Sequence, residues 1–404
     1  MAFYLVGWTI GIVWAGSSRR RMIFRSVGTT LLLFVLVVIL EIPAAIGMVD
    51  YAEVWTRLIG EWVGPTTNFV NDWDIGFHRP PNTKWSGQPR SDMAFTWNLP
   101  IRRPAPMTFT TDSRGFRNLV DRDEADIVLL GDSYVEGAYN SDDETCAAVL
   151  ERLTGEKVCN LAEAGYGTLQ ELEVLTRYAI PMKPRLVAWF FFEGNDLYDD
   201  EGFEGSLPYL REHKPIDSGR WNWSWEDFLK RSFTRTTYRT IRRGLEPLAP
   251  NNVANFGVFR DERSVEHRLY FYDYASISFG AYEKERFEKT KAAFRRGSQA
   301  CEEHGIQLVL FYIPMKYRVY SPYCTFARSS PCLKWTPWNL AYHFRQFCDE
   351  ESIAFVDLVE PMREAAAAGK VLYAPEDSHW NVAGHAFVAE RLRDEWERYR
   401  ASAR

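Results

Sequence analysis

The sequence predicts an α/β domain built on a parallel β-sheet. Short apolar, β-branched or aromatic runs that are typical of buried strands occur at residues 126–130, 157–161, 185–192, 307–313 and 354–358. Stretches with helical periodicity separate them, and this alternation is typical of βαβ units, whose strands are parallel. Polar motifs follow several of the strands. The pattern therefore predicts one sheet with polar residues gathered at its carboxyl edge.

Composition narrows the class of protein. The chain has 404 residues, of which 46% are hydrophobic and 25% charged. These fractions are near the average of folded soluble proteins, so disorder is excluded as the main state. The length predicts one large domain with additions, or two domains. The net charge of −6 argues against a nucleic-acid partner. Six cysteines are too few for a disulfide scaffold.

An apolar segment near the N-terminus, Thr29–Gly47, predicts a membrane anchor. About 20 apolar residues at 1.5 Å rise span a hydrocarbon core of ~30 Å. The run is longer than the apolar part of a cleavable signal peptide, so we favour a retained anchor over a cleaved signal or a buried core helix. Glu41 and Pro43 weaken this prediction, although both lie near one end of the run.

The charges that flank this segment predict its orientation. Four arginines precede it, namely Arg19, Arg20, Arg21 and Arg25. By the positive-inside rule that flank is cytoplasmic, which places the rest of the chain in the periplasm or outside the cell. Residues 2–16 are also apolar but short for a span. They either form a second transmembrane helix or precede the true start at Met22, so the anchor, residues 1–49, has one or two helices.

The rest of the chain divides into three parts. Residues 50–123 are rich in Trp, Pro, Asn and Arg and predict an extended, strand-poor lead-in that packs on the domain behind it. Residues 124–404 form the α/β domain, which residues 197–282 interrupt as a partly helical insertion. The insertion carries a basic run, residues 231–243, which either attracts an anionic glycan or lipid or is a solvated helix face.

Four polar motifs are candidates for a site. Gly131-Asp132-Ser133 ends the first strand, Gly165 follows the second, and Asn195-Asp196 follows the third; Glu376-Asp377-Ser378-His379 precedes the last helix. Because the carboxyl ends of parallel strands share one edge of a sheet, we expect these motifs to meet there.

These motifs, in this order, resemble those of the SGNH or GDSL hydrolase family. The resemblance implies a flavodoxin-like three-layer α/β/α sandwich and serine-dependent hydrolysis or transfer of acyl esters. In the lead-in, D-I-G-F-H-R-P-P-N from Asp74 and S-R-G-F-R from Ser113 resemble membrane-anchored bacterial members. The ending D-x-H-W-N from Asp377 resembles SGNH proteins that O-acetylate alginate and related exopolysaccharides.

The catalytic roles follow from residue type. Ser133 is the expected nucleophile, and His379 the expected base and later acid, because its reference pKa is near working pH. A carboxylate must orient the imidazole. The family usually places this carboxylate three residues before the histidine, where Glu376 stands, whereas Asp377 matches the D-x-H-W-N subgroup. We favour Asp377 and keep Glu376 as the alternative.

The resemblance also implies an oxyanion hole made by the backbone N–H groups of Ser133 and Gly165 and the side-chain amide of Asn195. In this chain Glu193 occupies a position where the family usually has glycine. Lys316, shortly after a strand, could reach the site or an acidic polymer, but we favour a surface lysine. We expect His385, in the last helix, to be structural. No histidine or cysteine spacing fits a metal site, so we expect neither metal nor cofactor.

Three functions are compatible with these features. The favoured one is an extracytoplasmic serine esterase or O-acyltransferase that acts on acyl groups of a cell-surface polysaccharide. The alternatives are a lipid-ester hydrolase and a catalytically silent scaffold in polysaccharide assembly. The expected partners are the membrane, through the N-terminal helix, an acylated carbohydrate or other ester, and polysaccharide-assembly proteins.

Overall fold

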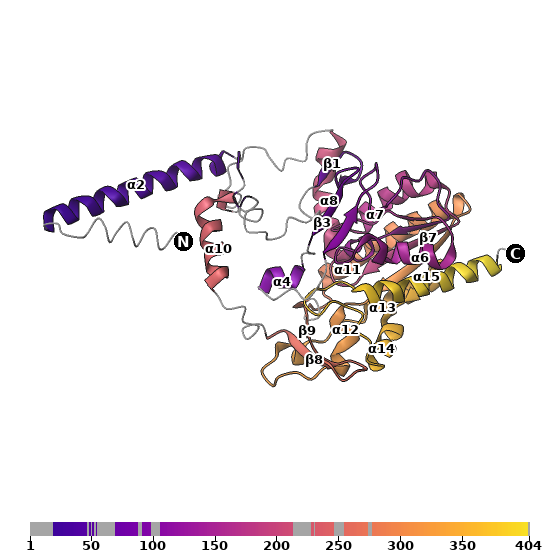
Figure 1. Cartoon of the computed structure of the whole chain (residues 1–404). Coiled ribbons are helices and arrows are strands. Elements are labelled where there is room, and N and C mark those ends of the chain that lie inside the picture. The colour runs from indigo at the N-terminus through magenta and orange to yellow at the C-terminus, as the bar shows by residue number, and fades with distance from the viewer. Residues whose placement is uncertain are drawn as a thin grey trace. The chain divides into compact units, whose positions relative to one another are not determined.

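The protein is described here by a computed structural model (Figure 1). The residues it describes are 19–46, 48–49, 51, 54, 69–87, 91–97, 106–212, 228–229, 231–245, 254–273 and 277–402. The chain divides into two compact units, Met1–Val63 with Arg220–Pro247, and Gly64–Gly219 with Leu248–Arg404. The apolar residues 2–16, expected to be a second transmembrane helix or to be absent, lie outside the described residues.

The first unit contains a long apolar helix, α2 (Arg19–Ala45). Within it, Val27–Ala45 is long and apolar enough to cross a membrane, judged by length and composition, and only 6% of this stretch is buried. A second helix of the same unit, α10 (Phe233–Leu245), contacts α2. The candidate span coincides with the segment that the sequence predicts as the anchor.

A five-stranded parallel sheet forms the centre of the second unit. Its strands are β5 (Ile127–Leu130), β6 (Val158–Asn160), β7 (Leu186–Phe192), β10 (Gln307–Ile313) and β11 (Ala354–Asp357). All five predicted strands are confirmed, each to within one residue at either end. The spatial order is β11-β10-β7-β5-β6, and every neighbouring pair is parallel. This is the flavodoxin-like order 2-1-3-4-5, in which ligands bind where the order reverses, between β5 and β7.

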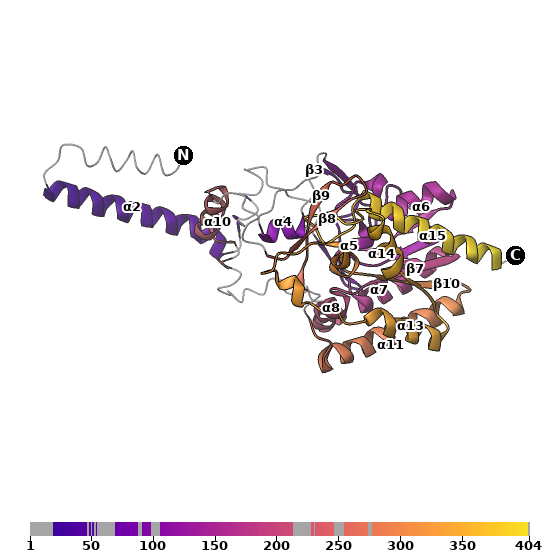
Figure 2. The same ribbon diagram turned by 90° about the horizontal axis from the view of Figure 1, so that it is seen from below.

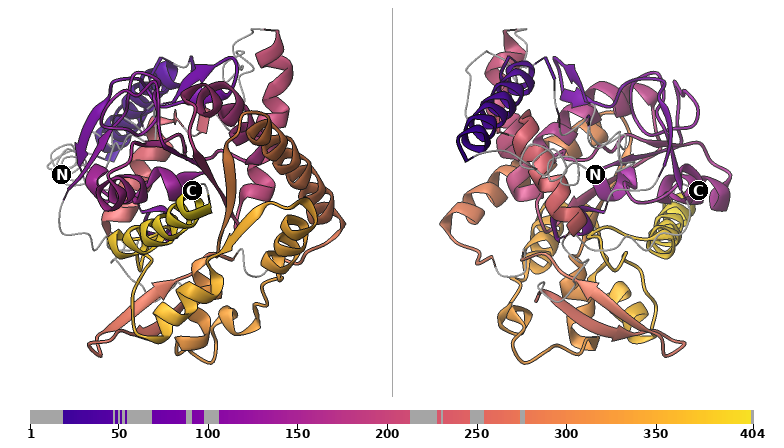
Figure 3. Two further views of the ribbon diagram at one scale, coloured as in Figure 1. Left: turned by 90° about the vertical axis from the view of Figure 1, so that its right-hand side faces the viewer. Right: turned by 60° about the vertical axis from the view of Figure 1, so that its left-hand side comes forward.

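Helices cover both faces of the sheet, which confirms the predicted three-layer α/β/α sandwich (Figures 2 and 3). One face packs against α6 (Cys146–Thr154), α14 (Val359–Ala367) and α15 (Val382–Ser402). The other packs against α7 (Thr168–Val174), α11 (Ala281–Glu303) and α13 (Leu340–Glu351). Every residue of β7 is therefore buried, which explains why its sequence is a continuous apolar run rather than an alternating one.

The lead-in is richer in strands than expected. It holds two antiparallel pairs, β1 (Val70–Asp72) with β2 (Gly76–His78) and β3 (Lys84–Gly87) with β4 (Met107–Thr110), and the short helix α4 (Asp92–Trp97). Most of the described residues of the lead-in still lie outside strands, and strands of three or four residues are too short to show a two-residue period.

The sequence predicts a partly helical insertion at residues 197–282. This stretch contains most of α8 (Asp196–Arg211), then α10, and then a β-hairpin. The hairpin joins β8 (Phe256–Arg260) to β9 (Glu266–Tyr270). The sequence did not indicate this hairpin.

Candidate active site

The predicted nucleophile, Ser133, begins the short helix α5 (Ser133–Glu136) directly after β5. Both ends of this helix are fixed. At its start the side chain of Asp132 accepts a hydrogen bond from the Tyr134 N–H at 3.0 Å. At its end Gly137 adopts φ 83° and donates its N–H to the Ser133 carbonyl oxygen at 3.0 Å. Glycine suits this left-handed conformation because it has no Cβ.

Ser133, His379 and Asp377 form a continuous relay. The Nε2 of His379 lies 2.7 Å from the Oγ of Ser133. Its Nδ1 lies 2.5 Å from the Oδ1 of Asp377. Glu376, the alternative acid, instead accepts a hydrogen bond from the Tyr139 hydroxyl at 2.9 Å. Of the two acidic candidates, Asp377 is thus the one that contacts His379.

The relay is strongly coupled electrostatically. Burial opposes protonation of His379. The charge of Asp377, its hydrogen bond to the ring and the charges of Asp92 and Asp132 together outweigh burial and raise the pKa of His379 to about 9. Burial opposes ionisation of Asp377. The charge of His379 and the hydrogen bonds from His379 and from the Asp92 N–H together outweigh burial and lower the pKa of Asp377 to about 2. Each of the two charges thus stabilises the other, so the pair favours a protonated imidazole beside an ionised carboxylate.

Asp92, from the lead-in, completes the hydrogen bonds of the acidic residue. Its backbone N–H donates to the Oδ2 of Asp377 at 2.8 Å. Its carboxylate accepts the Ser378 N–H at 3.0 Å and also the Ser378 hydroxyl. Burial, followed by the charge of Asp377, raises the pKa of Asp92 to about 7. Sequence reasoning missed this residue, because its only local signal is an acidic side chain at the start of a six-residue helix.

Asp92, Asp377 and His379 are the one group of metal-ligand side chains that the described part of the chain brings within 4.8 Å of one another. Their donor atoms are already engaged. The Asp377 Oδ1 faces the imidazole at 2.5 Å, and its Oδ2 accepts the Asp92 N–H. This set of contacts fits a proton relay better than it fits a cation.

Lys316 contacts the backbone of residues 374–377, directly before His379. It begins α12 (Lys316–Tyr320) and is buried, so the expectation of a surface lysine was wrong. Its Nζ donates to the carbonyl oxygens of Ala374 at 3.0 Å, Pro375 at 3.2 Å and Asp377 at 2.7 Å. Burial lowers the pKa of its ammonium group to about 8. Three carbonyl oxygens replace water around the charge and hold the backbone before His379.

The expected oxyanion donors lie at the carboxyl edge of three adjacent strands. Gly165 follows β6 and adopts φ 86°, a conformation that favours glycine. Asn195 follows β7, and its Nδ2 donates to the Oδ2 of Asp199 at 2.5 Å. An amide has two N–H bonds, so this contact orients the group and uses one of them. No hydrogen bond among the described residues joins Gly165 or Asn195 to Ser133, and their roles stay predictions.

Glu193, which replaces the glycine usual in the family, has a structural partner. Its buried carboxylate accepts hydrogen bonds from the Arg318 Nε at 2.7 Å, the Tyr312 hydroxyl at 2.6 Å and the Met315 N–H at 2.8 Å. A charge-assisted pair of this kind satisfies both buried ions. The departure from the family pattern therefore ties the end of β7 to α12.

Two arginines of the lead-in hold the helix that begins with Ser133. Arg79 donates from Nε to the Glu136 carboxylate at 2.9 Å, and the same nitrogen lies 2.8 Å from the Glu163 carboxylate. Arg117 donates from Nη1 to the Gly137 carbonyl oxygen at 2.5 Å. Both guanidinium groups are buried. They belong to the lead-in motifs F-H-R and R-G-F-R, which the sequence analysis noted only as a resemblance.

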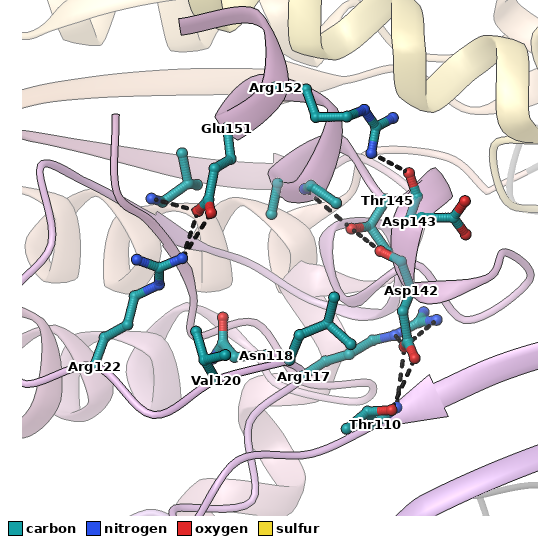
Figure 4. A pocket seen from close by; sticks show the side chains of 14 residues that line it. Thr110, Arg117, Asn118, Val120, Arg122, Asp142, Asp143, Thr145, Glu151 and Arg152 are labelled. Atoms are coloured by element: carbon teal, nitrogen blue, oxygen red, sulfur yellow. Dashed lines mark hydrogen bonds and ion pairs between the residues drawn. The ribbon is translucent and has the colours of Figure 1, made fainter. Parts of the chain in front are cut away.

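A cavity of about 210 Å³ lies between the lead-in and α6 (Figure 4). Two ion pairs lie in its lining, and Arg152 donates to the backbone carbonyl oxygen of Asp143 at 2.7 Å. Arg117 contacts Asp142 at 3.2 Å, and Arg122 contacts Glu151 at 2.7 Å. This cavity is a polar junction that joins the lead-in to α6, and it contains no residue of the relay.

One known family is similar to part of the chain. Residues 271–403, which include Asp377 and His379, match the family model described as the SGNH hydrolase-like domain of the acetyltransferase AlgX. This segment is similar to an SGNH hydrolase-like domain. Ser133, Gly165 and Asn195 precede it in sequence, and the shared sheet joins them to it.

One curated protein similar to the chain is the "Probable alginate O-acetylase AlgJ" of Pseudomonas putida. It is 30% identical over 105 residues, which are 26% of this chain and 26% of the relative. The chain thus matches about a quarter of the length of that protein.

Solved structures similar to the chain are esterases and lipases. A catalytic mutant of the acetylxylan esterase Axe2 from Geobacillus stearothermophilus has 13% identity and a TM-score of 0.34, over 68% of this chain and 95% of the other. A GDSL-like lipase from Bacteroides thetaiotaomicron has 11% identity and a TM-score of 0.33, over 67% and 87%. Similarity at this level does not assign a function.

Proposed function

We propose that the protein is a membrane-anchored serine esterase or O-acyltransferase whose catalytic residues are Ser133, His379 and Asp377. The observation that carries the proposal is the relay, with 2.7 Å from Ser133 to His379 and 2.5 Å from His379 to Asp377. A serine hydroxyl is a weak nucleophile until a base takes its proton, and this geometry supplies the base and its orienting acid.

The reaction follows from this geometry in two steps. Ser133 Oγ attacks the ester carbonyl carbon while its proton passes to the Nε2 of His379. The tetrahedral oxyanion is stabilised by the N–H groups of Ser133 and Gly165 and by the amide of Asn195. Loss of one such donor lowers kcat by about 10²–10³. The intermediate then expels the alcohol, which takes the proton from His379, and leaves an acyl-Ser133 ester.

In the second step water or a sugar hydroxyl attacks this acyl-enzyme. His379 again takes the proton of the attacking group and returns it to Ser133 Oγ as the acyl group leaves. Attack by water makes the protein an esterase, and attack by a sugar hydroxyl makes it an O-acyltransferase.

We further propose that the substrate is an acetylated polysaccharide outside the cytoplasm. The names of the AlgX family and of the AlgJ relative support an acetyl group and a polysaccharide. A depression near Asn195 supports a carbohydrate, because three aromatic side chains, Tyr198, Phe279 and Trp338, line it together with Glu283. The apolar span Val27–Ala45 of α2, preceded by four arginines in the same helix, supports an anchor with the catalytic domain on the far side of the membrane.

Turnover of p-nitrophenyl acetate by the full chain in detergent micelles tests the proposal. Wild type is expected to be active, and Ser133→Ala is expected to be at least about 10³-fold slower. A fluorophosphonate probe should label wild type and not Ser133→Ala. Equal turnover and equal labelling of the two proteins would reject the serine mechanism in favour of a silent scaffold.

Added glycans separate the remaining alternatives. Acetyl appearing on an added polysaccharide, measured by mass spectrometry, indicates a transferase, whereas release of acetate from an acetylated polysaccharide indicates an esterase. Turnover confined to long-chain lipid esters would overturn the carbohydrate substrate and leave the lipid-ester hydrolase.

A further inference from the structure

Helix α10 (Phe233–Leu245) has one basic arc and one apolar arc. At about 100° per residue, positions 235, 239, 242 and 243, all arginines, fall within an arc of about 100°. Positions 233, 237, 241 and 245 recur every four residues on another side and are Phe, Thr, Ile and Leu. This pattern is typical of helices that lie in the interface plane of a membrane, with basic residues toward anionic headgroups.

The N-terminus of α10 is fixed to the membrane helix by Glu41. The Glu41 carboxylate, in α2, accepts hydrogen bonds from the Thr234 N–H at 2.7 Å, the Phe233 N–H at 3.2 Å and the Ser232 hydroxyl at 2.9 Å. The first N–H groups of a helix have no partner within it, so an acidic side chain from outside satisfies them. The ring of Phe233 also contacts that of Tyr51, at 5.1 Å between centroids.

These contacts set the depth at which α10 begins. Glu41 lies four residues before Ala45, where the candidate span ends, which corresponds to about 6 Å along the helix axis. The span of 19 residues is itself about 28 Å long. Glu41 is therefore close to one membrane boundary, the extracytoplasmic one if the preceding arginines are cytoplasmic. The contacts also explain why an otherwise apolar helix carries a carboxylate.

We propose that α10 lies in the headgroup layer of the membrane that α2 spans, with its arginines on the phosphates of anionic phospholipids. The inference rests on the proposed anchor. Phospholipid fits better than an anionic glycan for two reasons. The helix presents an apolar side as well as a basic one, and Glu41 holds its start at the boundary where acyl chains and phosphates meet. A hydrated polysaccharide would use the charge but not the apolar side.

Amide hydrogen exchange of the segment 231–245 in the full chain tests this proposal. The protein is reconstituted in nanodiscs of phosphatidylcholine alone and in nanodiscs that also contain phosphatidylglycerol. Each basic residue near an anionic membrane raises the partition coefficient of a segment into the membrane surface about fivefold. Amide exchange in 231–245 is therefore expected to slow at least about tenfold when phosphatidylglycerol is present. High salt should reduce the difference, because it screens the headgroup charge.

Two matched variants separate charge from structure. Replacement of Arg235, Arg239, Arg242 and Arg243 by glutamine should abolish the lipid-dependent slowing, whereas replacement of the same four by lysine should preserve it. Equal exchange in the two kinds of nanodisc would overturn the proposal. Slowing by a soluble anionic polysaccharide in phosphatidylcholine nanodiscs, without an effect of phosphatidylglycerol, would overturn it in favour of a glycan site.

The anchor and the catalytic proposal have separate readouts. Co-purification with nanodiscs in high salt reports whether α2 inserts, and p-nitrophenyl acetate turnover reports the relay. If the protein inserts and turns over substrate but its exchange in 231–245 does not slow with phosphatidylglycerol, only the proposed contact of α10 with lipid is rejected.

Discussion

The backbone N–H of Asp92 donates to the Oδ2 of Asp377 at 2.8 Å, across 285 positions of sequence. The acidic residue of the relay is thus held from two sides, by the imidazole at one carboxylate oxygen and by the lead-in at the other. The negative charge of Asp92 also contributes to raising the pKa of His379.

Replacing Asp92 by asparagine should shift the pH dependence of turnover. The backbone N–H remains, but the negative charge near His379 is lost, so the pKa of His379 should fall. Because only neutral His379 accepts a proton, kcat/KM rises with pH through this pKa, and its rising limb should move to lower pH. The pH profile for p-nitrophenyl acetate measures this. Asp121→Asn, at an exposed carboxylate, is the matched control, and an unmoved limb in Asp92→Asn would contradict the prediction.

Asp377→Asn and Glu376→Gln should differ sharply. Asp377→Asn removes the charge that orients and stabilises the imidazolium, and kcat should fall by about 10³–10⁴. The wild-type rising limb, expected near pH 9 from the raised pKa of His379, should also move to lower pH in this variant. Glu376 contacts Tyr139 and not His379, so Glu376→Gln should keep kcat within about tenfold. A larger loss in Glu376→Gln than in Asp377→Asn would exchange their roles.

Removing one member of the Arg318–Glu193 pair should lower the free energy of unfolding more than removing both. Arg318→Met leaves the Glu193 carboxylate buried without its counter-charge, and we expect the free energy of unfolding to fall by about 3–5 kcal/mol. The double variant Arg318→Met/Glu193→Gln should recover part of this loss, because neither ion then remains buried. Thermal or urea unfolding of the four proteins forms a double-mutant cycle. Additive losses would show that the two side chains do not interact.

Gly137→Ala should affect both stability and turnover, and the chain offers a close control. Gly137 and Gly155 end helices with φ of 83° and 73°, so alanine at either position is strained by about 1–2 kcal/mol. A Cβ at Gly137 would also lie 2.9 Å from the Thr145 Cγ2, whereas one at Gly155 meets nothing within 4 Å. Gly137→Ala should therefore melt at a lower temperature than Gly155→Ala. It alone should lower kcat, because Gly137 ends the helix that begins with Ser133.

The strands of the central sheet were predictable because burial on both faces requires continuous apolar runs in the sequence. Every residue of β7 is apolar and buried, and the bounds of β10 coincide with the predicted run 307–313. The half-exposed strand β3 and the hairpin of β8 and β9 leave a weaker pattern. Burial alternates along β3 and β8, but these strands have only four and five residues and mix polar with apolar side chains. Periodicity therefore detects the central strands and misses the peripheral ones.

The candidate site was predictable where a motif is local and not where it depends on distant contacts. Ser133, Asp377 and His379 stand in recognisable motifs, and the structure brings them together. Asp92 carries no motif, and Lys316 follows a strand as many surface lysines do. Their contacts arise only once the lead-in and α12 pack against the segment before His379, which single-sequence reasoning does not supply.

The contacts of Arg79 and Arg117 determine how far the chain can be truncated at its N-terminal side. A fragment excised just before β5 would retain every strand of the central sheet and all three members of the relay, yet it would lose both guanidinium groups. Glu136 and Glu163 would then be two neighbouring carboxylates without the cation that now lies between them. The smallest fragment expected to fold and turn over ester is therefore larger than its αβ repeats suggest, and its N-terminal boundary lies ahead of β1.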